Sequence, residues 1–158
     1  MSIKPITIHN RQHVIPFFIE HWGSTQMIIS SGTFDCAQLD GFIYEVDDVI
    51  LGLLTYVVHE DAVEVISLDS IREGQGIGSQ LMNAIELLAK EKDLAKITLI
   101  TTNDNLAALK FYQKRGYRIV NIIRDAVAQA RKIKPTIPFI GNDAIPLHDE
   151  LVLEKYLL

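Results

Sequence analysis

Apolar runs in the first half of the chain predict a short helix followed by several strands. A helix with an aromatic face is expected over residues 13–22. Residues 41–47 and 49–58 are predicted to be strands, and the second is a nearly continuous apolar run, which is typical of a strand buried on both faces. A polar turn then leads into a further strand over 62–69, so the last two strands should form an antiparallel hairpin.

The middle of the chain changes to the spacing of a helix and then back to that of a strand. One helical face collects apolar side chains, at Ile77, Leu81, Ile85, Leu88 and Ala89. Residues 96–101 are rich in β-branched side chains and are predicted to form a strand.

A second helix is indicated by the residues at its two ends. The run Asn103-Asp104-Asn105 offers side chains that cap a helix N-terminus. Gly116 suits the position just past a helix C-terminus. The chain then returns as a strand over 117–124.

The last part of the chain combines two regular elements with a long irregular one. Residues 125–133 are predicted to be helical, and 150–154 can close the sheet as a strand. Residues 134–149, between them, contain several prolines and no periodic pattern. A loop this long inside a compact domain is usually functional or disordered.

This order of elements predicts an α/β (α+β) fold in a single domain over 1–158. A chain of 158 residues is long enough to bury a sizeable core. Its composition, 48% apolar and 22% charged residues, is ordinary for a globular protein.

Composition and charge narrow the expected partners. No apolar run reaches the roughly 18 residues that a membrane helix needs, and the first residues do not resemble a signal peptide, so we expect a cytoplasmic protein without a membrane partner. A net charge of −5 argues against nucleic acid as a partner and is compatible with a cationic one. The single cysteine, Cys36, has no second Cys and no nearby His, so we expect neither a disulfide nor a metal site and interpret it as a half-buried loop residue.

A glycine-rich turn, residues 73–78 (EGQGIG), precedes the longer predicted helix. A helix N-terminus presents unpaired N–H groups and a partial positive charge, and glycines let a phosphate approach them closely. Five amides are predicted to wrap a pyrophosphate, those of Gln75, Gly76, Ile77, Gly78 and Ser79. A tight strand-to-helix connection without a ligand is the alternative.

Two familiar phosphate-binding motifs do not fit this turn. A Walker A loop requires a lysine that Gly78-Ser79-Gln80 lacks. A Rossmann turn has the spacing G-x-G-x-x-G after a strand of a parallel βαβ unit, whereas this turn has G-x-G-x-G after a strand that is expected to pair antiparallel.

A second motif, NLAALKFYQKRGY at residues 105–117, changes the interpretation of the first. Together the two motifs resemble the GNAT superfamily of acetyl-CoA-dependent N-acetyltransferases. Those proteins carry a turn Q/R-x-x-G-x-G/A, matched here at Gly76 and Gly78, and then a pattern like N-x-x-A-x-x-F-Y-x-K-x-G-F. The second pattern is matched at Asn105, Ala108, Phe111, Tyr112, Lys114 and Gly116, with Tyr117 as the final aromatic residue.

The chain departs from the family pattern at one position of the turn. Glu73 occupies the Q/R position, and Arg72 is displaced from it by one residue. A carboxylate beside a pyrophosphate is unfavourable, so Glu73 is expected to point to solvent while Arg72 supplies the positive charge.

The resemblance implies the acyl-CoA N-acyltransferase fold and a place for its cofactor. That fold has a mixed central sheet of about six to seven strands with helices on both faces. A V-shaped gap between the strands at 62–69 and 96–101 holds the pantetheine arm of acetyl-CoA. Beside the amides of the turn, the implied cofactor-binding residues are Leu68, Asp69, Ser70, Arg72, Asn105, Ala108 and Tyr112, and no metal is implied.

The resemblance also implies direct attack of a primary amine on acetyl-CoA. Glu64 is the first candidate base, because some family members place a glutamate at this point of the strand; an exposed carboxylate paired across the hairpin is the alternative. Asp69 is the second candidate base, and its alternative role is to cap the turn. Tyr112 is the candidate acid that protonates the leaving thiolate, with core packing as its alternative.

The acceptor is not identified by the sequence. The resemblance implies that residues 13–40 and 125–150 select a small-molecule or peptide amine, and we expect the 134–149 loop to border the acceptor site. Other side chains have both a structural and an acceptor-binding interpretation: the carboxylates of Asp35, Asp40 and Glu45, the aromatic cluster of Phe17, Phe18 and Trp22, and His148 beside Asp149. A non-catalytic acyl-CoA sensor remains the alternative function. Homodimers are common in the family, and no interface is specified by the sequence.

Overall fold

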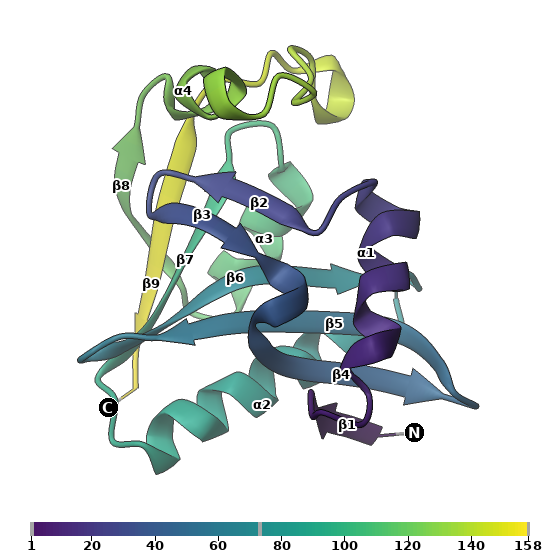
Figure 1. Ribbon diagram of the computed structural model, residues 1–158. Coiled ribbons are helices and arrows are strands. Elements are labelled where there is room, and N and C mark those ends of the chain that lie inside the picture. The colour runs from purple at the N-terminus through teal and green to yellow at the C-terminus, as the bar shows by residue number, and fades with distance from the viewer. Residues whose placement is uncertain (1, 73, 158) are drawn as a thin grey trace. The chain divides into compact units, whose positions relative to one another are not determined.

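The computed structural model describes residues 2–72 and 74–157, which form nine strands and four α-helices (Figure 1). The helices are α1 (Val14–Trp22), α2 (Ile77–Glu91), α3 (Leu106–Lys114) and α4 (Ala126–Ile133). The strands are β1 (Ser2–Pro5), β2 (Gln26–Ile29), β3 (Gly32–Asp35), β4 (Asp40–Val46), β5 (Val49–Val58), β6 (Ala62–Ser70), β7 (Lys96–Thr102), β8 (Arg118–Ile123) and β9 (Glu150–Tyr156).

Seven of these strands form one sheet, in the order β1-β4-β5-β6-β7-β9-β8, and β2 and β3 form a separate two-stranded sheet. The expectation of about six to seven strands is therefore confirmed. Strand β1 and the β2–β3 pair were not predicted, because four-residue strands are too short to show an alternating pattern. None of the described helices combines the length and the apolar composition that a membrane span needs.

The chain divides into two compact units. The first contains the residues up to Met27, the segment Phe34–Ile97 and Leu157, and the second contains Ile28–Thr33 and Thr98–Tyr156. The single-domain expectation and the gap between the strands at 62–69 and 96–101 stay predictions.

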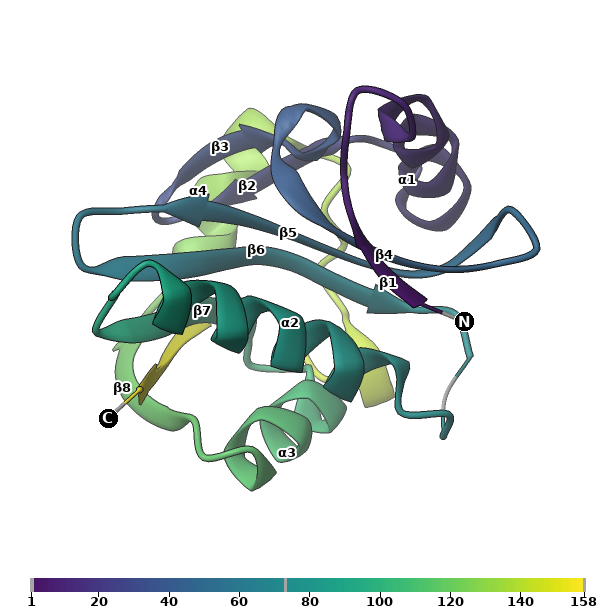
Figure 2. The ribbon, with the colours of Figure 1, turned by 90° about the horizontal axis from the view of Figure 1, so that it is seen from below.

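In the first unit, helices cover both faces of the layer formed by β4, β5 and β6, with α1 on one side and α2 on the other (Figure 2). The predicted apolar face of α2 is largely confirmed: Ile77, Leu81, Ile85 and Ala89 are buried, whereas Leu88 is half-buried. The helix approaches the sheet closely at Gly52, where a Cβ atom would lie 2.4 Å from Cγ2 of Ile77.

An irregularity in the β5–β6 ladder decides which side chains of β6 share a face. The register shifts between Thr55 and Tyr56, so that Glu64, Ser67 and Asp69 lie opposite Val57, Thr55 and Leu53. These three positions alternate along β5 and therefore point to the same face of the sheet. Glu64, Ser67 and Asp69 form what is called below the polar strip of β6.

In the second unit, helix α3 has the caps that the sequence predicts. Oδ1 of Asn105 accepts a hydrogen bond from the amide of Ala108 at 3.2 Å. Gly116 has a φ of +93°, and the amide of Tyr117 donates to the carbonyl oxygen of Tyr112 at 3.1 Å, which ends the helix. Strands β8 and β9 then pair antiparallel with one register shift between Ile119 and Asn121.

Candidate active site

The glycine turn leads directly into α2 through two residues with left-handed backbone. Gly74 and Gly76 have φ values of +77° and +72°, and Gly76 is the N-cap of the helix. The first helical hydrogen bond after this cap runs from the amide of Gln80 to the carbonyl oxygen of Gly76, at 3.0 Å. The amides of Ile77, Gly78 and Ser79 precede it and have no acceptor inside the helix. The turn therefore has the geometry predicted for an anion-binding helix start, and its phosphate contacts stay a prediction.

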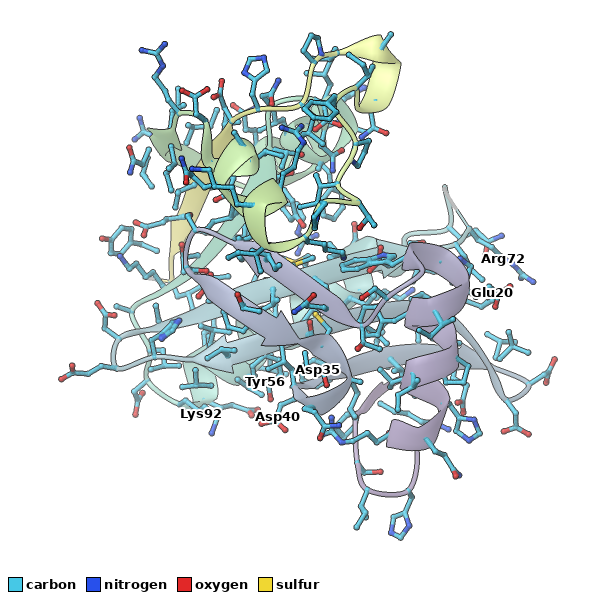
Figure 3. All side chains as sticks on the ribbon, turned by 45° about the horizontal axis from the view of Figure 1, so that its top comes forward. Glu20, Asp35, Asp40, Tyr56, Arg72 and Lys92 are labelled. Carbon is cyan, nitrogen blue, oxygen red and sulfur yellow. The ribbon has the colours of Figure 1, made fainter. Side chains whose placement is uncertain are left out.

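The residues that flank the turn are placed differently. Arg72 is exposed and its side chain points outward from the turn (Figure 3). The carbonyl oxygen of Arg72 accepts a hydrogen bond from the hydroxyl of Ser70 at 3.1 Å. Glu73, which was expected to point to solvent, lies outside the described residues.

The three residues expected to hold the pantetheine arm are the last three of β6. Leu68, Asp69 and Ser70 pair in register with Leu54, Leu53 and Gly52 of β5. Their backbone lies immediately before the glycine turn, as the resemblance implies.

The side chain of Asp69 is half-buried, and hydrogen bonds satisfy only one of its two oxygens. Its Oδ1 accepts a hydrogen bond from Nε1 of Trp22 at 3.0 Å, whereas its Oδ2 is buried and has no partner in the part of the chain that the structure describes. Burial raises the pKa of Asp69 to about 6, against the opposing effects of the Trp22 N–H and of nearby His21. The side chain of Asp69 thus bonds α1, not the turn that it was expected to cap in the alternative interpretation.

Glu64 combines features of both interpretations given to it. It pairs across the hairpin, because its Oε1 lies 2.9 Å from Nε2 of His59. It is not exposed, however, since its side chain is only 5% accessible while that of His59 is 49% accessible. The register shift explains the error, because it turns Glu64 onto the same face as Ser67 and Asp69, where α1 and the segment after β3 cover the sheet.

The middle of the polar strip contacts the cysteine. The hydroxyls of Thr55 and Ser67 hydrogen-bond to each other, and both lie against the thiol of Cys36. Cys36 is completely buried at the start of a 3-10 helix (Cys36–Gln38), so the expectation of a half-buried loop residue is wrong. Burial raises the pKa of this thiol to about 11. The contacts with Thr55 of β5 and Ser67 of β6 come from later parts of the chain, so the sequence around Cys36 does not signal them.

Tyr112 lies in the second unit, in the last turn of α3. It is 8% exposed and makes edge-on ring contacts with Phe111 and Tyr117, at centroid distances of 5.2 and 5.8 Å. The packing role proposed as the alternative is therefore present. It is compatible with the role of a general acid, which stays a prediction.

The 134–149 loop is ordered by three polar side chains that sequence reasoning did not single out for this role. The guanidinium of Arg131 donates to the carbonyl oxygens of Ile137, Pro138 and Leu147 and lies over the Phe139 ring at 4.4 Å. These bonds fold the loop back against the end of α4.

The other two side chains come from the turn after β7. Oδ1 of Asn103 accepts hydrogen bonds from the amides of His148 and Asp149, each at 3.0 Å. Oδ2 of Asp104 accepts one from the amide of Asn142 at 2.8 Å. Of the three predicted helix caps, only Asn105 caps α3; Asn103 and Asp104 hold the loop. No periodicity signals such side-chain bonds to a distant backbone.

The remaining acceptor-site candidates have structural partners. Oδ1 of Asp35 accepts from the amide of Ala37, Asp40 lies 3.8 Å from Arg11, and Glu45 lies 3.2 Å from Lys4. Phe17 and Phe18 are buried in the core.

His148 is exposed, and its Nδ1 lies 3.2 Å from Oδ2 of Asp149. The hydrogen bond from the Asp125 amide lowers the pKa of Asp149. Among the described residues, no group of His, Cys, Asp and Glu side chains is arranged to hold a metal ion.

Comparisons with known proteins agree with the two motifs. The family model described as the acetyltransferase (GNAT) family matches residues 8–117. A Bacillus subtilis (strain 168) protein described as uncharacterized protein YxbD is 49% identical over 158 residues, which cover 99% of each chain.

Solved structures show the same fold at much lower sequence identity. An IAA acetyltransferase from Bacillus cereus ATCC 14579 matches with a TM-score of 0.76 at 18% identity, over 99% of both chains. A GNAT family acetyltransferase from Elizabethkingia anophelis, with acetyl-CoA bound, matches with a TM-score of 0.68 at 21% identity, over 99% of this chain and 97% of that one.

Proposed function

The chain belongs to the acetyltransferase (GNAT) family, and we propose that it is an N-acetyltransferase that transfers the acetyl group of acetyl-CoA to a primary amine of a small molecule or peptide. The observation that carries this proposal is the start of α2, where two left-handed glycines leave a row of amides without helical acceptors. Such a row binds a phosphate chain, which the acetyl donor carries and a simple thioester does not. The acetyl-CoA bound to the Elizabethkingia anophelis protein supports the same donor.

The residues proposed to hold the donor come before and after this turn in the sequence. Backbone groups of Leu68, Asp69 and Ser70, the last three residues of β6, are proposed to bond the pantetheine arm, and Arg72 is proposed to add a positive charge near the phosphates. Asn105 and Ala108 at the start of α3, together with Tyr112, complete the set. When bound, acetyl-CoA supplies an activated acetyl thioester.

The reaction needs a base because the acceptor amine is protonated. An alkyl amine with a pKa near 10.4 is neutral in only about one molecule in 2500 at pH 7. The polar strip of β6 offers two carboxylates for this proton, Glu64 and Asp69, both held on one face of the strand. A carboxylate removes the proton so that the nitrogen lone pair can attack the thioester carbonyl carbon.

Tyr112 is proposed to protonate the thiolate that leaves. A phenol held in a fixed orientation by ring packing can donate its proton to the developing sulfur anion, an effect typically worth about 10²–10⁴-fold in rate. We expect Tyr112→Phe to lower kcat by about this factor and to leave the affinity for coenzyme A largely intact, because the ring packing with Phe111 and Tyr117 is retained. An unchanged kcat would remove Tyr112 from the mechanism.

The experiment that tests the function has two stages. Calorimetry first measures acetyl-CoA binding to the purified protein, and a thiol-release screen against a panel of amines follows. Binding with thiol release on one class of amine supports the proposal and identifies the acceptor class. Binding without release on any amine favours the acyl-CoA sensor, and no binding contradicts both. Dimer formation and a cytoplasmic location are parts of the same proposal, to be tested by sedimentation and by fractionation.

A further inference from the structure

The carboxylate of Asp69 presents an unusual combination of burial and incomplete bonding. Its Oδ2 is shielded from solvent and has no hydrogen-bond partner among the described residues, while Oδ1 is bonded to Trp22. Native proteins rarely keep a buried polar atom unsatisfied, because the atom gives up its hydration without replacement. An atom of this kind therefore calls for a partner that arrives later, and a proton donor is what a carboxylate oxygen accepts.

The orientation of this carboxylate is fixed from two sides. The indole of Trp22 packs against Phe18 with a centroid distance of 5.1 Å and an interplanar angle of 74°, and this packing aims its N–H at Oδ1. The backbone of Asp69 is paired with Leu53 in the β5–β6 ladder, one residue before the end of the strand. Both restraints lie within the first unit, and together they leave Oδ2 as the single free acceptor of the side chain.

Glu64, the other carboxylate of the polar strip, has a different hydrogen-bond partner. Its Oε1 is bonded to Nε2 of His59, and about half of the His59 side chain is open to solvent. The two carboxylates occupy the same face of one strand. Among the described residues, only Asp69 of these two has a buried oxygen without a hydrogen-bond partner.

We propose that Asp69 is the base that receives the proton of the acceptor amine through Oδ2, and that Trp22 is a positioning residue that holds the carboxylate for this purpose. The inference rests on the proposed function and selects one of its two candidate bases. The acceptor class that fits is an alkyl ammonium group, which can donate a hydrogen bond to Oδ2 before it transfers the proton.

The proton and electron balance of the step is complete with the groups already named. An N–H bond of the ammonium breaks, the proton goes to Oδ2 and the electron pair stays on nitrogen. That pair forms the bond to the acetyl carbon, and the carbon–sulfur bond breaks with its pair going to sulfur. The nitrogen then loses a second proton to solvent, Tyr112 gives its proton to the thiolate and regains one from solvent, and Asp69 releases its proton to solvent as the product leaves.

The surroundings of Asp69 in the first unit give the proposal a pH dependence. Burial raises its pKa to about 6, whereas the Trp22 N–H and His21, both of α1, lower it. Cys36 faces it from the 3-10 helix after β3, with a pKa raised to about 11, and so stays a neutral thiol near neutral pH. The base is ionised and competent above about pH 6 and protonated and incompetent below, so kcat/KM should fall on the acidic side of this value.

The first arm of the test measures kcat/KM against pH for wild type and single variants. Asp69→Asn is expected to lower kcat by about 10²–10⁴-fold. The fall of kcat/KM below about pH 6, called here the acidic limb of the pH profile, is expected to be absent in this variant. Trp22→Phe is expected to move that limb to higher pH, because the lost N–H favoured the ionised form. Asp93→Asn, an exposed change of the same type, is expected to leave the profile as in wild type. A limb that persists in Asp69→Asn, or that disappears only in Glu64→Gln, overturns the proposal.

The second arm needs no acceptor, so it separates this inference from the proposed function. Trp22 is the only tryptophan of the chain, so protein fluorescence reports on the indole that bonds Asp69. We expect its emission to titrate near pH 6 in wild type and in His21→Gln, and not in Asp69→Asn. A titration that His21→Gln abolishes, or that Asp69→Asn retains, contradicts the assignment. If the titration is found but no amine gives thiol release, the proposed function fails while the protonation behaviour of Asp69 stands.

The key variant is expected to fold. The pKa of Asp69 is higher in the folded chain than the ordinary value of 3.8, so its contribution to stability is present at low pH and is lost as the pH rises through about 6. At neutral pH, Asp69→Asn removes a partly buried charge and should therefore melt at or above the wild-type temperature. Trp22→Phe keeps the ring contact with Phe18 and provides the independent variant.

Discussion

The glycine turn before α2 and the 134–149 loop are both irregular, yet their backbone groups are used in opposite ways. In the turn, the φ values of Gly74 and Gly76 set the shape, and amides are left over at the helix start. In the loop, side chains from outside set the shape, and they bond the loop's backbone carbonyls and amides, as Arg131 and Asp104 do. A segment whose amides have no helical acceptor is suited to bind an anion. A segment whose backbone groups are bonded by side chains is suited to border a binding site without bonding the ligand through its backbone.

This difference has a consequence for mutational sensitivity. Changes in the turn should alter ligand affinity first: Cβ atoms at Gly74 and Gly76 would meet no atom within 4 Å, so their main cost is the backbone strain at positive φ. Changes at the residues that hold the loop should alter stability first, and activity only through the loop. The following variants test this contrast.

The largest effect is expected for Arg131→Met. The variant keeps much of the side-chain volume but leaves the carbonyl oxygens of Ile137, Pro138 and Leu147 without their shared donor. We expect a loss of about 2–4 kcal/mol in the free energy of unfolding, measured by urea denaturation, and faster proteolytic cleavage within 134–149. Lys132→Met, an exposed position of the same helix, is the matched control and should stay within about 0.5 kcal/mol of wild type. Equal decreases of the free energy of unfolding in the two variants would mean that Arg131 does not organise the loop.

Gly76→Val should produce the next largest effect, and on affinity. A β-branched residue is strained at a φ of +72°, and relief of that strain rotates the amides at the start of α2. We expect coenzyme A affinity, measured by calorimetry, to fall about 10- to 100-fold, which corresponds to about one charge-assisted hydrogen bond.

The control for this variant carries the same strain at another place. Gly23 ends α1 with a φ of +74°, and a Cβ atom there would meet no atom within 4 Å, so Gly23→Val should lower Tm by a similar amount. The affinity of Gly23→Val for coenzyme A should match that of wild type. Equal loss of affinity in both variants would show that general strain, not the amides of the turn, is responsible.

The smallest effect is expected for a pair of residues in the loop. A Cβ at Gly141 would lie 2.1 Å from Oδ2 of Asp104, so Gly141→Ala should destabilise the chain by about 1–3 kcal/mol. Asp104→Ala alone loses its bond to the Asn142 amide, at a cost of about 1–2 kcal/mol. The double variant should cost less than the sum, because truncating Asp104 removes the clash. Strict additivity in urea denaturation would argue against direct contact between the two positions.

Local features of the chain could be predicted from the sequence, and those that depend on distant contacts could not. The caps of α3 at Asn105 and Gly116 were predicted because a cap acts within one helical turn. The burial of Glu64 was missed because a register shift in the ladder changes the alternation, and no residue type in the sequence marks it. The buried state of Cys36 depends on β5 and β6, and the order of the 134–149 loop depends on Asn103, Asp104 and Arg131.

In the candidate site too, local features were predicted from the sequence and features that depend on distant contacts were not. The turn and the helix motif were found from their spacing, because glycines and caps are required at fixed positions. The half-satisfied state of Asp69 depends on a bond from Trp22, which lies 47 positions earlier in the chain. A single sequence gives no signal for such a pair, although it did name Asp69 as a candidate base.

The complete burial of Cys36 makes this protein convenient to study with thiol-specific dyes. An exposed cysteine with a pKa near 8.5 is about one-quarter ionised at pH 8, but at a pKa of about 11 the ionised fraction of Cys36 is about one in a thousand. The folded chain should therefore be almost silent toward a disulfide dye, and any colour in a turnover assay would come from released coenzyme A. In denaturant, the one thiol becomes reactive only in molecules that have opened. One reagent then counts both catalytic events and unfolded chains, and the ratio of the two signals separates an inactive variant from an unfolded one.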